Sequence, residues 1–222
     1  MINIAIDGPA GAGKSSLSRL LAKELSYIYV DTGALYRAVG LKFSRLGFDT
    51  ELKGDIDTVL EDTMLDIRFI EGTQRVFLDG EDVSDDIRTP TASMMASAVS
   101  AKPVVREFLL GMQRRLAEKN NVVMDGRDIG TVILPNADVK IFLTADVKVR
   151  AERRYKELIE KGQTVDFDEV LEDMKTRDYN DSHRPIAPLK QADDAVLADT
   201  TTLSFDESLE LLKKIVREGI AK

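Results

Sequence analysis

One short stretch near the start of the chain has the residue types and spacing that bind phosphate. Residues 8–15 read Gly-Pro-Ala-Gly-Ala-Gly-Lys-Ser and match the pattern G-x-x-x-x-G-K-[ST] in full. The glycines of this pattern let backbone N–H groups point inward around a polyphosphate. Lys14 is placed to reach the β- and γ-phosphate oxygens, and the Ser15 hydroxyl to ligate Mg²⁺. This stretch, the phosphate loop, predicts binding of a nucleoside triphosphate together with Mg²⁺.

A phosphate loop occurs in kinases, GTPases and motors, so other residues must distinguish these classes. A GTPase would carry an Asn/Thr-Lys-x-Asp element for guanine, and this chain has none. The nearest string, at 190–193, reads Lys-Gln-Ala-Asp and has the wrong spacing. We therefore expect ATP to be the nucleotide, bound by the loop and the residue after it: Gly8, Pro9, Ala10, Gly11, Ala12, Gly13, Lys14, Ser15 and Ser16.

Arginines recur at the ends of predicted strands and helices downstream of the loop. Arg37 follows the second predicted strand, Arg127 follows the third, and Arg177 and Arg184 lie where a predicted helix ends. Any one of them could form a solvated surface ion pair. Arg37 and Arg127, however, follow core strands at the edge where ligands bind in open parallel sheets, and arginine binds phosphate through two parallel hydrogen bonds. This placement favours a second phosphorylated substrate.

The near absence of histidine also narrows the chemistry. A kinase that phosphorylates an alcohol is expected to hold a general base near that alcohol. A phosphate acceptor already carries an anionic oxygen, because its second pKa is about 6. The single histidine, His183, is expected in a loop rather than as a catalyst. The sequence thus indicates phosphoryl transfer from ATP to another phosphate group.

Alternating strands and helices must position these residues. The hydrophobic patterns predict strands at 2–6, 27–30, 121–124, 139–143 and 195–197. They predict a helix at 14–25, a second that follows residues 31–33 and runs through 46, and a third at 205–217. Helical stretches are also expected after strands 121–124 and 139–143. This order is typical of an α/β protein of the P-loop NTPase fold, with a five-stranded parallel sheet and helices on both faces.

Residues 64–100 interrupt that alternation. Runs 65–70 and 75–78, separated by Glu-Gly-Thr-Gln, predict an antiparallel hairpin, and an alanine- and serine-rich helix follows. We expect a small antiparallel-β and helix lobe inserted between the second and third core strands.

Composition argues against several other classes of protein. Cysteine is absent and histidine occurs once, which excludes a disulfide framework and a multi-histidine zinc site. The formal net charge of −8 argues against broad adsorption to nucleic acid or to membranes. Neither a signal peptide nor an apolar run of about 18 residues is found. We expect a cytoplasmic protein, and a monomer because no exposed apolar stripe stands out.

Seven motifs occur in order along nearly the whole chain. They are Ile-Asp-Gly-Pro-Ala-Gly-Ala-Gly-Lys-Ser (6–15), Asp-Thr-Gly-Ala-Leu-Tyr-Arg (31–37), Gly-Glu-Asp-Val-Ser (80–84), Ile-Arg-Thr (87–89), Asp-Gly-Arg-Asp-Ile-Gly-Thr-Val (125–132), Lys-Ile-Phe-Leu (140–143) and Arg-Asp-Tyr-Asn-Asp-Ser-His-Arg (177–184). In this combination the sequence closely resembles the bacterial cytidylate kinases, a family of P-loop nucleoside monophosphate kinases. The resemblance implies transfer from Mg-ATP to CMP or dCMP in pyrimidine nucleotide metabolism. It also implies a core at 1–34 and 101–222, a monophosphate-binding region at 35–100 with the lobe at 64–100, and a lid at about 154–164.

The resemblance further implies roles for individual residues. Arg37 and Arg127 would hold the acceptor phosphate, and Lys14 and Arg177 would assist the transfer, while Arg153 would close over ATP. Asp181, with Arg177, would meet the ribose or the transferring phosphates. The residues implied around the acceptor pocket and the cytosine are Thr32, Ser97, Arg106, Asp128 and Arg184.

The chemistry of cytosine is consistent with those roles. Its 4-amino group donates and needs an acceptor such as Asp128, whereas its N3 and O2 accept and suit donors such as Arg106 and Arg184. Uracil reverses the pattern at positions 3 and 4, which would leave buried groups unpaired at about 1–3 kcal/mol each.

Two rival functions and one metal ligand stay open. The chain could be a P-loop kinase for another small acceptor, such as UMP, shikimate or gluconate, or a nucleotide-binding switch that is not a kinase. Shikimate- and gluconate-type enzymes lack the inserted lobe, and a switch needs no acceptor-side arginines. The second protein ligand for Mg²⁺ is undecided, because Asp31 and Asp125 both end predicted strands and either could be structural.

Overall fold

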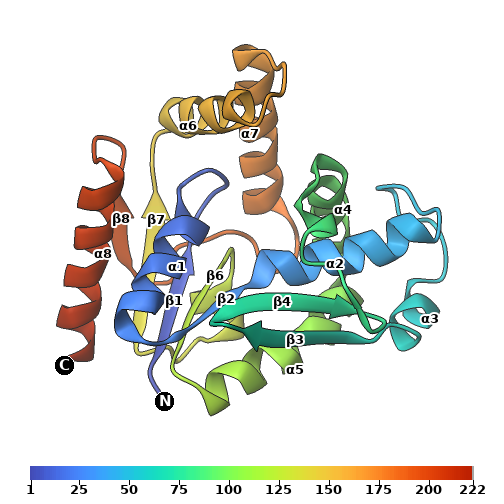
Figure 1. Cartoon of the computed structure of the whole chain (residues 1–222), viewed down its shortest axis with the longest axis horizontal. Coiled ribbons are helices and arrows are strands. Elements are labelled where there is room, and N and C mark those ends of the chain that lie inside the picture. Colours follow the sequence, from blue (N-terminus) through green and yellow to red (C-terminus); the bar gives the residue numbers. More distant parts are fainter. Residues whose placement is uncertain (222) are drawn as a thin grey trace. The chain divides into compact units, whose positions relative to one another are not determined.

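The computed structural model of the chain describes residues 1–221, which divide into two compact units (Figure 1). One comprises Ile2–Tyr27 and the chain from Asn121 onward, and we call it the phosphate-loop unit. The other comprises Ile28–Asn120 together with Met1, and we call it the hairpin unit.

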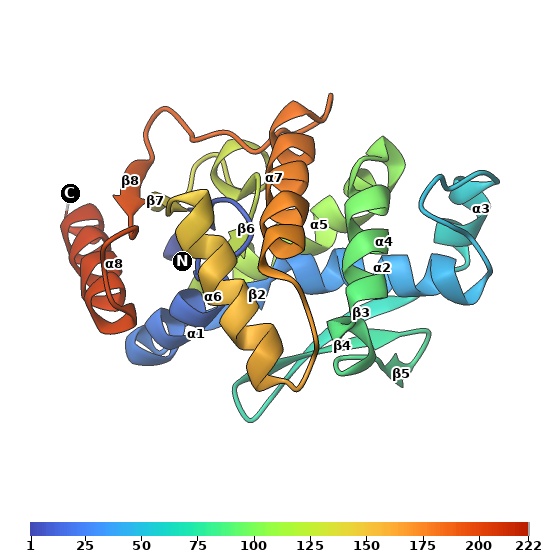
Figure 2. The same ribbon diagram turned by 90° about the horizontal axis from the view of Figure 1, so that it is seen from above.

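The phosphate-loop unit alternates strands and helices. Its elements in chain order are β1 (Asn3–Asp7), α1 (Lys14–Leu25), β6 (Val122–Gly126), a π-helical turn (Ile129–Ile133), β7 (Val139–Thr144), α6 (Val147–Glu160), α7 (Phe167–His183), β8 (Val196–Asp199) and α8 (Phe205–Ile220). Helices α1 and α8 contact each other. Helices α6 and α7 lie side by side around a small apolar core that includes Ala151, Leu158 and Met174 (Figure 2).

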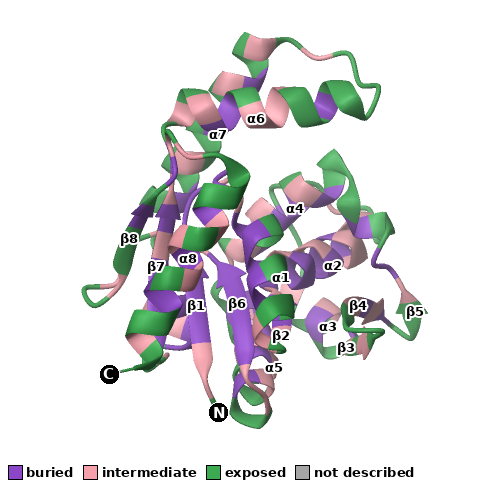
Figure 3. Cartoon of the chain, turned by 60° about the vertical axis from the view of Figure 1, so that its left-hand side comes forward, coloured by how far each residue is buried: buried purple, intermediate pink, exposed green. Residues whose placement is uncertain are grey.

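The central sheet has five strands in the order β2-β6-β1-β7-β8, where β2 is Ile28–Asp31, and the predicted sheet is confirmed. Within the phosphate-loop unit β1 pairs in parallel with both β6 and β7, and β7 pairs in parallel with β8. Residues Ile4, Ala5 and Ile6 of β1 are fully buried, and Figure 3 shows β1 and β6 as buried over most of their length. A strand flanked on both sides and covered on both faces needs a continuous apolar run, which is the pattern found in the sequence.

The carboxyl end of β1 leads directly into the phosphate loop. Asp7, the last residue of β1, pairs with Gly126 of β6 on one side and with Phe142 of β7 on the other. The chain then turns at Gly8, where φ is +151° and a Cβ atom would lie 1.9 Å from the carbonyl oxygen of Leu143. Since only glycine fits this approach, Gly8 fixes the start of the loop against β7.

Most helix starts in this unit are capped by side chains. Asp146 caps α6, Asp166 caps α7, and Ser204 with Glu207 forms a capping box at α8. Helix α1 instead begins after Gly13, which has a φ of +85° and provides no side-chain cap. A helix N-terminus of this kind, opening from a glycine-rich loop, is suited to binding phosphate.

The hairpin unit contains the interruption that the sequence indicated. After β2 its elements are α2 (Thr32–Arg45), α3 (Ile56–Glu61), β3 (Leu65–Ile70), β4 (Thr73–Leu78), β5 (Glu81–Asp82), a 3-10 turn (Asp86–Arg88), α4 (Pro90–Ser100) and α5 (Pro103–Lys119). The antiparallel pairing of β3 with β4, with Leu65 opposite Leu78, confirms the predicted hairpin. Strand β5 adds a third strand that was not predicted, because two residues show no periodicity.

Close packing of two helices organises this unit. A Cβ atom at Gly40 of α2 would lie 2.9 Å from the Cβ atom of Met95, so the glycine allows α4 to approach α2 closely. The fully buried side chains of Phe43, Leu35 and Leu109 form part of the same core. The result is a rigid support for the residues on α2 and α4 that the sequence singled out.

Some helices differ from expectation. The stretch after β6 is a single π-helical turn instead of a longer helix, because Gly130 and the β-branched residues that follow it are weak helix formers and Pro135 ends the run. His183, expected in a loop, is the last residue of α7. Residues 154–164 form the second half of α6 and the turn after it. Among residues 1–221 no helix has the length and apolar character needed to cross a bilayer.

Candidate active site

The phosphate loop is shaped by its glycines and contains the side chain of Lys14. Gly11 and Gly13 have φ values of +71° and +85°, left-handed conformations that glycine adopts without steric cost. The Lys14 side chain is buried, and its Nζ donates to the carbonyl oxygen of Pro9 at 2.7 Å. The ammonium group therefore lies against the backbone of the loop that is expected to bind phosphate.

Four charged side chains act on Lys14. Burial lowers the pKa of Lys14 well below its usual value, and the positive charges of Arg127 and Arg177 lower it further. The carboxylates of Asp125 and Asp181 oppose this shift. The structure thus brings together Lys14, Arg127, Arg177 and Asp181, all singled out from the sequence, within one electrostatic environment. A group of cations partly balanced by carboxylates favours a polyanionic ligand.

Of the two candidates for the second magnesium ligand, Asp125 is the one that contacts the phosphate loop. It is buried near the end of β6, and its Oδ2 accepts a hydrogen bond from the Ser15 hydroxyl at 3.0 Å. Asp31 has another role, since it caps α2 and pairs with Arg37. No cluster of three or more potential metal-binding side chains occurs among residues 1–221. Two hard oxygen donors fit Mg²⁺, which in nucleotide sites takes one or two protein ligands and completes its shell with phosphates and water.

Arg127 is oriented by Asp181. Its Nε donates to Asp181 Oδ2 at 2.7 Å, and its Nη1 to the carbonyl oxygen of Gly126 at 3.4 Å. Burial alone would raise the pKa of Asp181, but the charges of Arg127, Arg177 and Arg184 together lower it. Asp181 is therefore ionised at neutral pH and holds the guanidinium group of Arg127 in place.

Asp128 and Arg184 form a second buried pair in the same unit. Arg184 Nη2 lies 3.3 Å from Asp128 Oδ1, and the two side chains are 8% and 4% exposed. Arg184 Nε also donates to the carbonyl oxygen of Ala187 at 2.6 Å. The pair presents a carboxylate next to a guanidinium group, the two kinds of group expected for cytosine.

Arg37 is held at the start of α2 in the hairpin unit. Its Nη2 donates to Asp31 Oδ2 at 2.9 Å, while Asp31 Oδ1 accepts the N–H of Ala34 as the helix cap. A Cβ atom at Gly33 would lie 3.0 Å from Arg37 Nη1, so the glycine leaves room for the guanidinium group. Within the motif Asp-Thr-Gly-Ala-Leu-Tyr-Arg, the first residue therefore holds the guanidinium group of the last in place.

The other predicted residues of the hairpin unit lie on its helices. Arg106, near the start of α5, is buried, and its guanidinium carbon lies 5.6 Å from the ring centroid of Tyr36. Its Nη1 donates to the carbonyl oxygen of Ser100 at 3.2 Å. Thr32 is buried at the start of α2, and Ser97 is half-buried on α4.

Two arginines of α6 have different neighbours. Arg153, the predicted ATP contact, donates from Nη2 to the carbonyl oxygen of Thr200 at 2.8 Å, in the loop after β8. Arg150, for which no role was predicted, donates to the carbonyl oxygen of Ala10 at 2.9 Å and to Asp178 Oδ2 at 2.7 Å. It therefore connects the phosphate loop to α7. The two arginines lie three residues apart on the same helix, and only the folded structure shows that their hydrogen-bond partners differ.

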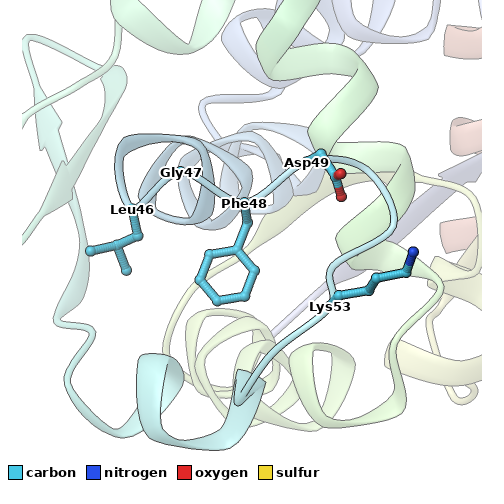
Figure 4. Close-up of a pocket in the computed structure, with 5 residues that line it drawn as sticks. All are labelled: Leu46, Gly47, Phe48, Asp49 and Lys53. Atoms are coloured by element: carbon cyan, nitrogen blue, oxygen red, sulfur yellow. The ribbon is translucent and has the colours of Figure 1, made fainter.

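A pocket of about 280 Å³ lies at the loop after α2 in the hairpin unit (Figure 4). Figure 4 shows the residues that line it: Leu46, Gly47, Phe48, Asp49 and Lys53. Phe48 also packs edge-to-face against Phe43 of the core, with 5.2 Å between ring centroids. None of these lining residues was predicted to bind a substrate, and we assign the pocket no function.

The family model and the sequence relatives agree on one family. A family model of cytidylate kinase matches residues 4–218. A cytidylate kinase of Caldicellulosiruptor bescii is 52% identical over 223 positions, with 99% of each chain covered. A cytidylate kinase of Syntrophotalea carbinolica is 49% identical, with 97% of this chain and 92% of that protein covered.

A solved structure supports the fold alone. An uncharacterized protein from Eubacterium ventriosum aligns with a TM-score of 0.52 at 15% identity, covering 98% of each chain. The motif content, the geometry of the phosphate-loop unit and the full-length matches point the same way. This chain belongs to the cytidylate kinase family.

Proposed function

We propose that the chain transfers the γ-phosphoryl group of Mg-ATP to the phosphate of CMP or dCMP, giving ADP and CDP or dCDP. The observation that carries this proposal is the grouping of Lys14, Arg127 and Arg177 in one electrostatic environment. Asp128, the residue directly after Arg127, forms a buried pair with Arg184, and this pair suits a cytosine base. Relatives named cytidylate kinase, about half identical over more than nine tenths of their length, support the same acceptor.

The donor side is built on the phosphate loop. Its backbone N–H groups and Lys14 would bind the β- and γ-phosphates of ATP. Ser15 and Asp125 would hold Mg²⁺, which would neutralise part of the charge on the phosphates of ATP. Arg153 on α6 remains the predicted side-chain contact to the nucleotide.

The acceptor phosphate would be bound by arginines that are already oriented. Asp181 holds Arg127 at 2.7 Å, and Asp31 holds Arg37 at 2.9 Å. A guanidinium group fixed before the substrate arrives loses less freedom on binding, which favours a reactive geometry. Arg177 would neutralise charge on the transferring phosphoryl group, and Thr32 would complete the acceptor pocket.

The reaction needs positioning more than proton transfer. An oxygen of the CMP phosphate forms a bond to the γ-phosphorus of ATP, and the bond from that phosphorus to the β–γ bridging oxygen breaks. The electron pair of the broken bond leaves with ADP. The attacking oxygen is ionised above its second pKa of about 6, so no side chain has to remove a proton. Lys14, Arg127 and Arg177 would stabilise the charge that shifts between the phosphates.

The base would be recognised by donors and acceptors in nearly buried positions. Asp128 would accept from the 4-amino group of cytosine, and Arg184 and Arg106 would donate to its ring acceptors. Ser97 would contribute a further polar contact. A base of the wrong pattern would disrupt these buried pairings, and sites of this type discriminate strongly.

The direct test is ADP release from Mg-ATP with a panel of acceptors: CMP, dCMP, UMP, AMP, shikimate, gluconate and buffer alone. We expect rapid turnover with CMP and dCMP, slower turnover with UMP and little with the others. Comparable rates with AMP or without acceptor would overturn the proposal, and a preference for shikimate or gluconate would favour another kinase class.

Lys14→Met tests the donor site. Methionine is unbranched and only one heavy atom shorter than lysine but carries no charge, so turnover should fall by about 10²–10³-fold or more while the fold is retained. Near-normal activity of a folded Lys14→Met protein would refute the phosphate-loop assignment. The cytoplasmic location and the monomeric state stay predictions from the sequence.

A further inference from the structure

Asp7 is a buried carboxylate that the proposed reaction does not use. It ends β1 directly before Gly8 of the phosphate loop, and it is 4% exposed. Its Oδ1 accepts the backbone N–H of Ile129, and its Oδ2 accepts that of Gly130, each at 2.7 Å. Hydrogen bonds to an ionised carboxylate are about twice as strong as those between neutral groups. The two bonds therefore fix this segment of backbone firmly to the start of the phosphate loop.

The segment held by Asp7 is the one that carries the acceptor residues. Ile129 and Gly130 open the π-helical turn and follow Arg127 and Asp128 directly. The first N–H groups of a helix find no partner within it and need an external acceptor. Any displacement of Ile129 would move Asp128, its immediate neighbour in the chain.

Asp7 does the capping that Asp128 would otherwise do. Asp128 stands at the position before the π-helical turn, where an aspartate side chain ordinarily caps the helix. It makes no such cap here, and its carboxylate pairs with Arg184 instead. A carboxylate turned back onto its own helix could not also face a base. The cap supplied by Asp7, 122 positions from Ile129, therefore keeps Asp128 oriented towards Arg184.

Gly130 lets the carboxylate come this close. A Cβ atom there would lie 3.3 Å from Asp7 Oδ2 and 3.2 Å from the Cδ atom of Lys140. Both distances are tighter than ordinary van der Waals contact, so a larger residue would press on the carboxylate. The missing side chain at Gly130 thus leaves the space that the carboxylate of Asp7 occupies.

The charge on Asp7 is costly to the fold. Burial raises its pKa to about 6, the neighbouring charge of Asp128 adds to the shift, and the two N–H groups and Lys14 oppose it. Lys140 also lies next to Gly130, but its Nζ pairs with Asp194. Asparagine has the same shape without the charge, but its amide has a single acceptor oxygen, so one of the two N–H groups would face an NH2 group. The carboxylate accepts both N–H groups at once.

We infer that Asp7 is a positioning residue for the acceptor: by holding the backbone at Ile129 and Gly130, it sets Arg127 and Asp128 in register with the phosphate loop. This inference rests on the proposed function, because it assumes that those two residues bind the acceptor nucleotide.

The test compares the parent protein with Asp7→Asn and with Asp138→Asn as a matched control. Asp138, the residue before β7, is also a carboxylate that accepts a backbone N–H: its Oδ2 accepts that of Asn3 at 2.7 Å. Asn3 lies at the opposite end of β1 from Asp7 and the phosphate loop. Steady-state assays give KM for ATP and kcat/KM for CMP and UMP. In Asp7→Asn we expect kcat/KM for CMP to fall about tenfold or more, and the preference for CMP over UMP to fall with it. KM for ATP should change less than about threefold, and Asp138→Asn should match the parent in every constant.

Each outcome bears on the inference. Losses of equal size for CMP, UMP and ATP would mean that Asp7 supports the whole phosphate loop, and the inference would be wrong. Unchanged kinetics with a lower melting temperature would leave Asp7 as a structural cap only, which also overturns it. A parent protein that does not phosphorylate CMP would overturn the proposed function and this inference together, so the parent's own activity separates the two failures.

A second variant keeps the inference testable if Asp7→Asn does not fold. Gly130→Ala leaves the carboxylate intact and displaces it by a few tenths of an ångström. It should show the same selective loss for CMP at a smaller size. A Gly130→Ala protein with unchanged preference for CMP would count against a positioning role.

The pH profile provides a signature that a structural role would not produce. Protonated Asp7 resembles asparagine, so the ratio of kcat/KM for CMP between the parent and Asp7→Asn should approach one below about pH 6. Titration of the CMP phosphate occurs with both proteins and cancels in the ratio. A ratio that stays constant from pH 5 to pH 8 would contradict the inference.

Discussion

Asp128 and Arg184 are the residues on which the choice of acceptor is expected to depend. Their side chains are nearly fully buried, and the atoms that pair lie 3.3 Å apart. A carboxylate has room for several hydrogen bonds, so Asp128 can accept from an amino group while paired with Arg184. The 4-oxo group of uracil would instead bring a second acceptor to the same carboxylate. Under the proposed function, discrimination between the two bases would rest mainly on Asp128.

Asp128→Ala should therefore reduce kcat/KM for CMP far more than for UMP. One lost hydrogen bond to a charged acceptor corresponds to about 1–3 kcal/mol, or roughly tenfold to a hundredfold in the ratio of the two constants. Asp193→Ala is the control, because that side chain is 99% exposed. Equal losses for CMP and UMP would remove Asp128 from base recognition.

The residues proposed to bind ligands were predicted from the sequence, but the side chains that hold them in place could not be. Lys14 and Ser15 stand at fixed places in a motif whose chemistry is known. Asp125, the partner of Ser15, lies 110 positions away, and only the parallel pairing of β1 with β6 brings the two together. Asp7 was missed for the same reason, since its acceptor role depends on a turn far along the chain.

At the scale of elements, the strands of the central sheet and the helix after the phosphate loop could be predicted, whereas the shortest elements of the hairpin unit could not. Helix α1 has the predicted bounds, and strands β3 and β7 begin at the predicted residues. Strand β5 and helix α3 are too short for a hydrophobic period to appear in the sequence. Gly130 and Pro135 are local signals against a longer helix after β6, but the carboxylate of Asp7 that accepts the first N–H groups of the π-helical turn lies on another strand and has no local signal.

One link between elements also has no local signal. Arg150 on α6 donates to Ala10 of the phosphate loop and to Asp178 on α7. Helix α7 carries Arg177 and Asp181, so α6, α7 and the loop are connected through a single buried guanidinium group. Because arginine offers five donors in a fixed plane, lysine could not make these contacts together.

For the whole molecule, Asp7 makes stability depend on pH. Its pKa in the folded chain is raised from 3.8 to about 6, mainly by burial. Between these two values the folded chain keeps a proton that the unfolded chain has released. The contribution of this group to the free energy of unfolding therefore falls as pH rises through this range. Above pH 6 the folded protein carries the buried charge.

Asp7→Asn should remove that dependence. We expect the variant to melt at a higher temperature than the parent at pH 8, and the difference in unfolding free energy to be smaller by about 1 kcal/mol at pH 5. Lys14, whose pKa is lowered, is present in both proteins and largely cancels. Calorimetry at the two pH values measures the effect. A variant less stable than the parent at pH 8 would show that the carboxylate stabilises the fold.

Helix α1 starts after Gly13 without a side-chain cap, unlike α6, α7 and α8 of the same unit. Bound ATP would supply the acceptors at that end, so the substrate would also act as part of the folded structure. A ligand at a hundred times its Kd raises the free energy of unfolding by about 2.7 kcal/mol. Thermolysin should therefore cleave the protein more slowly with Mg-ATP than without it, and equal cleavage rates would contradict this account. In a cell, turnover of the enzyme would then follow the nucleotide supply: molecules without nucleotide would be degraded first.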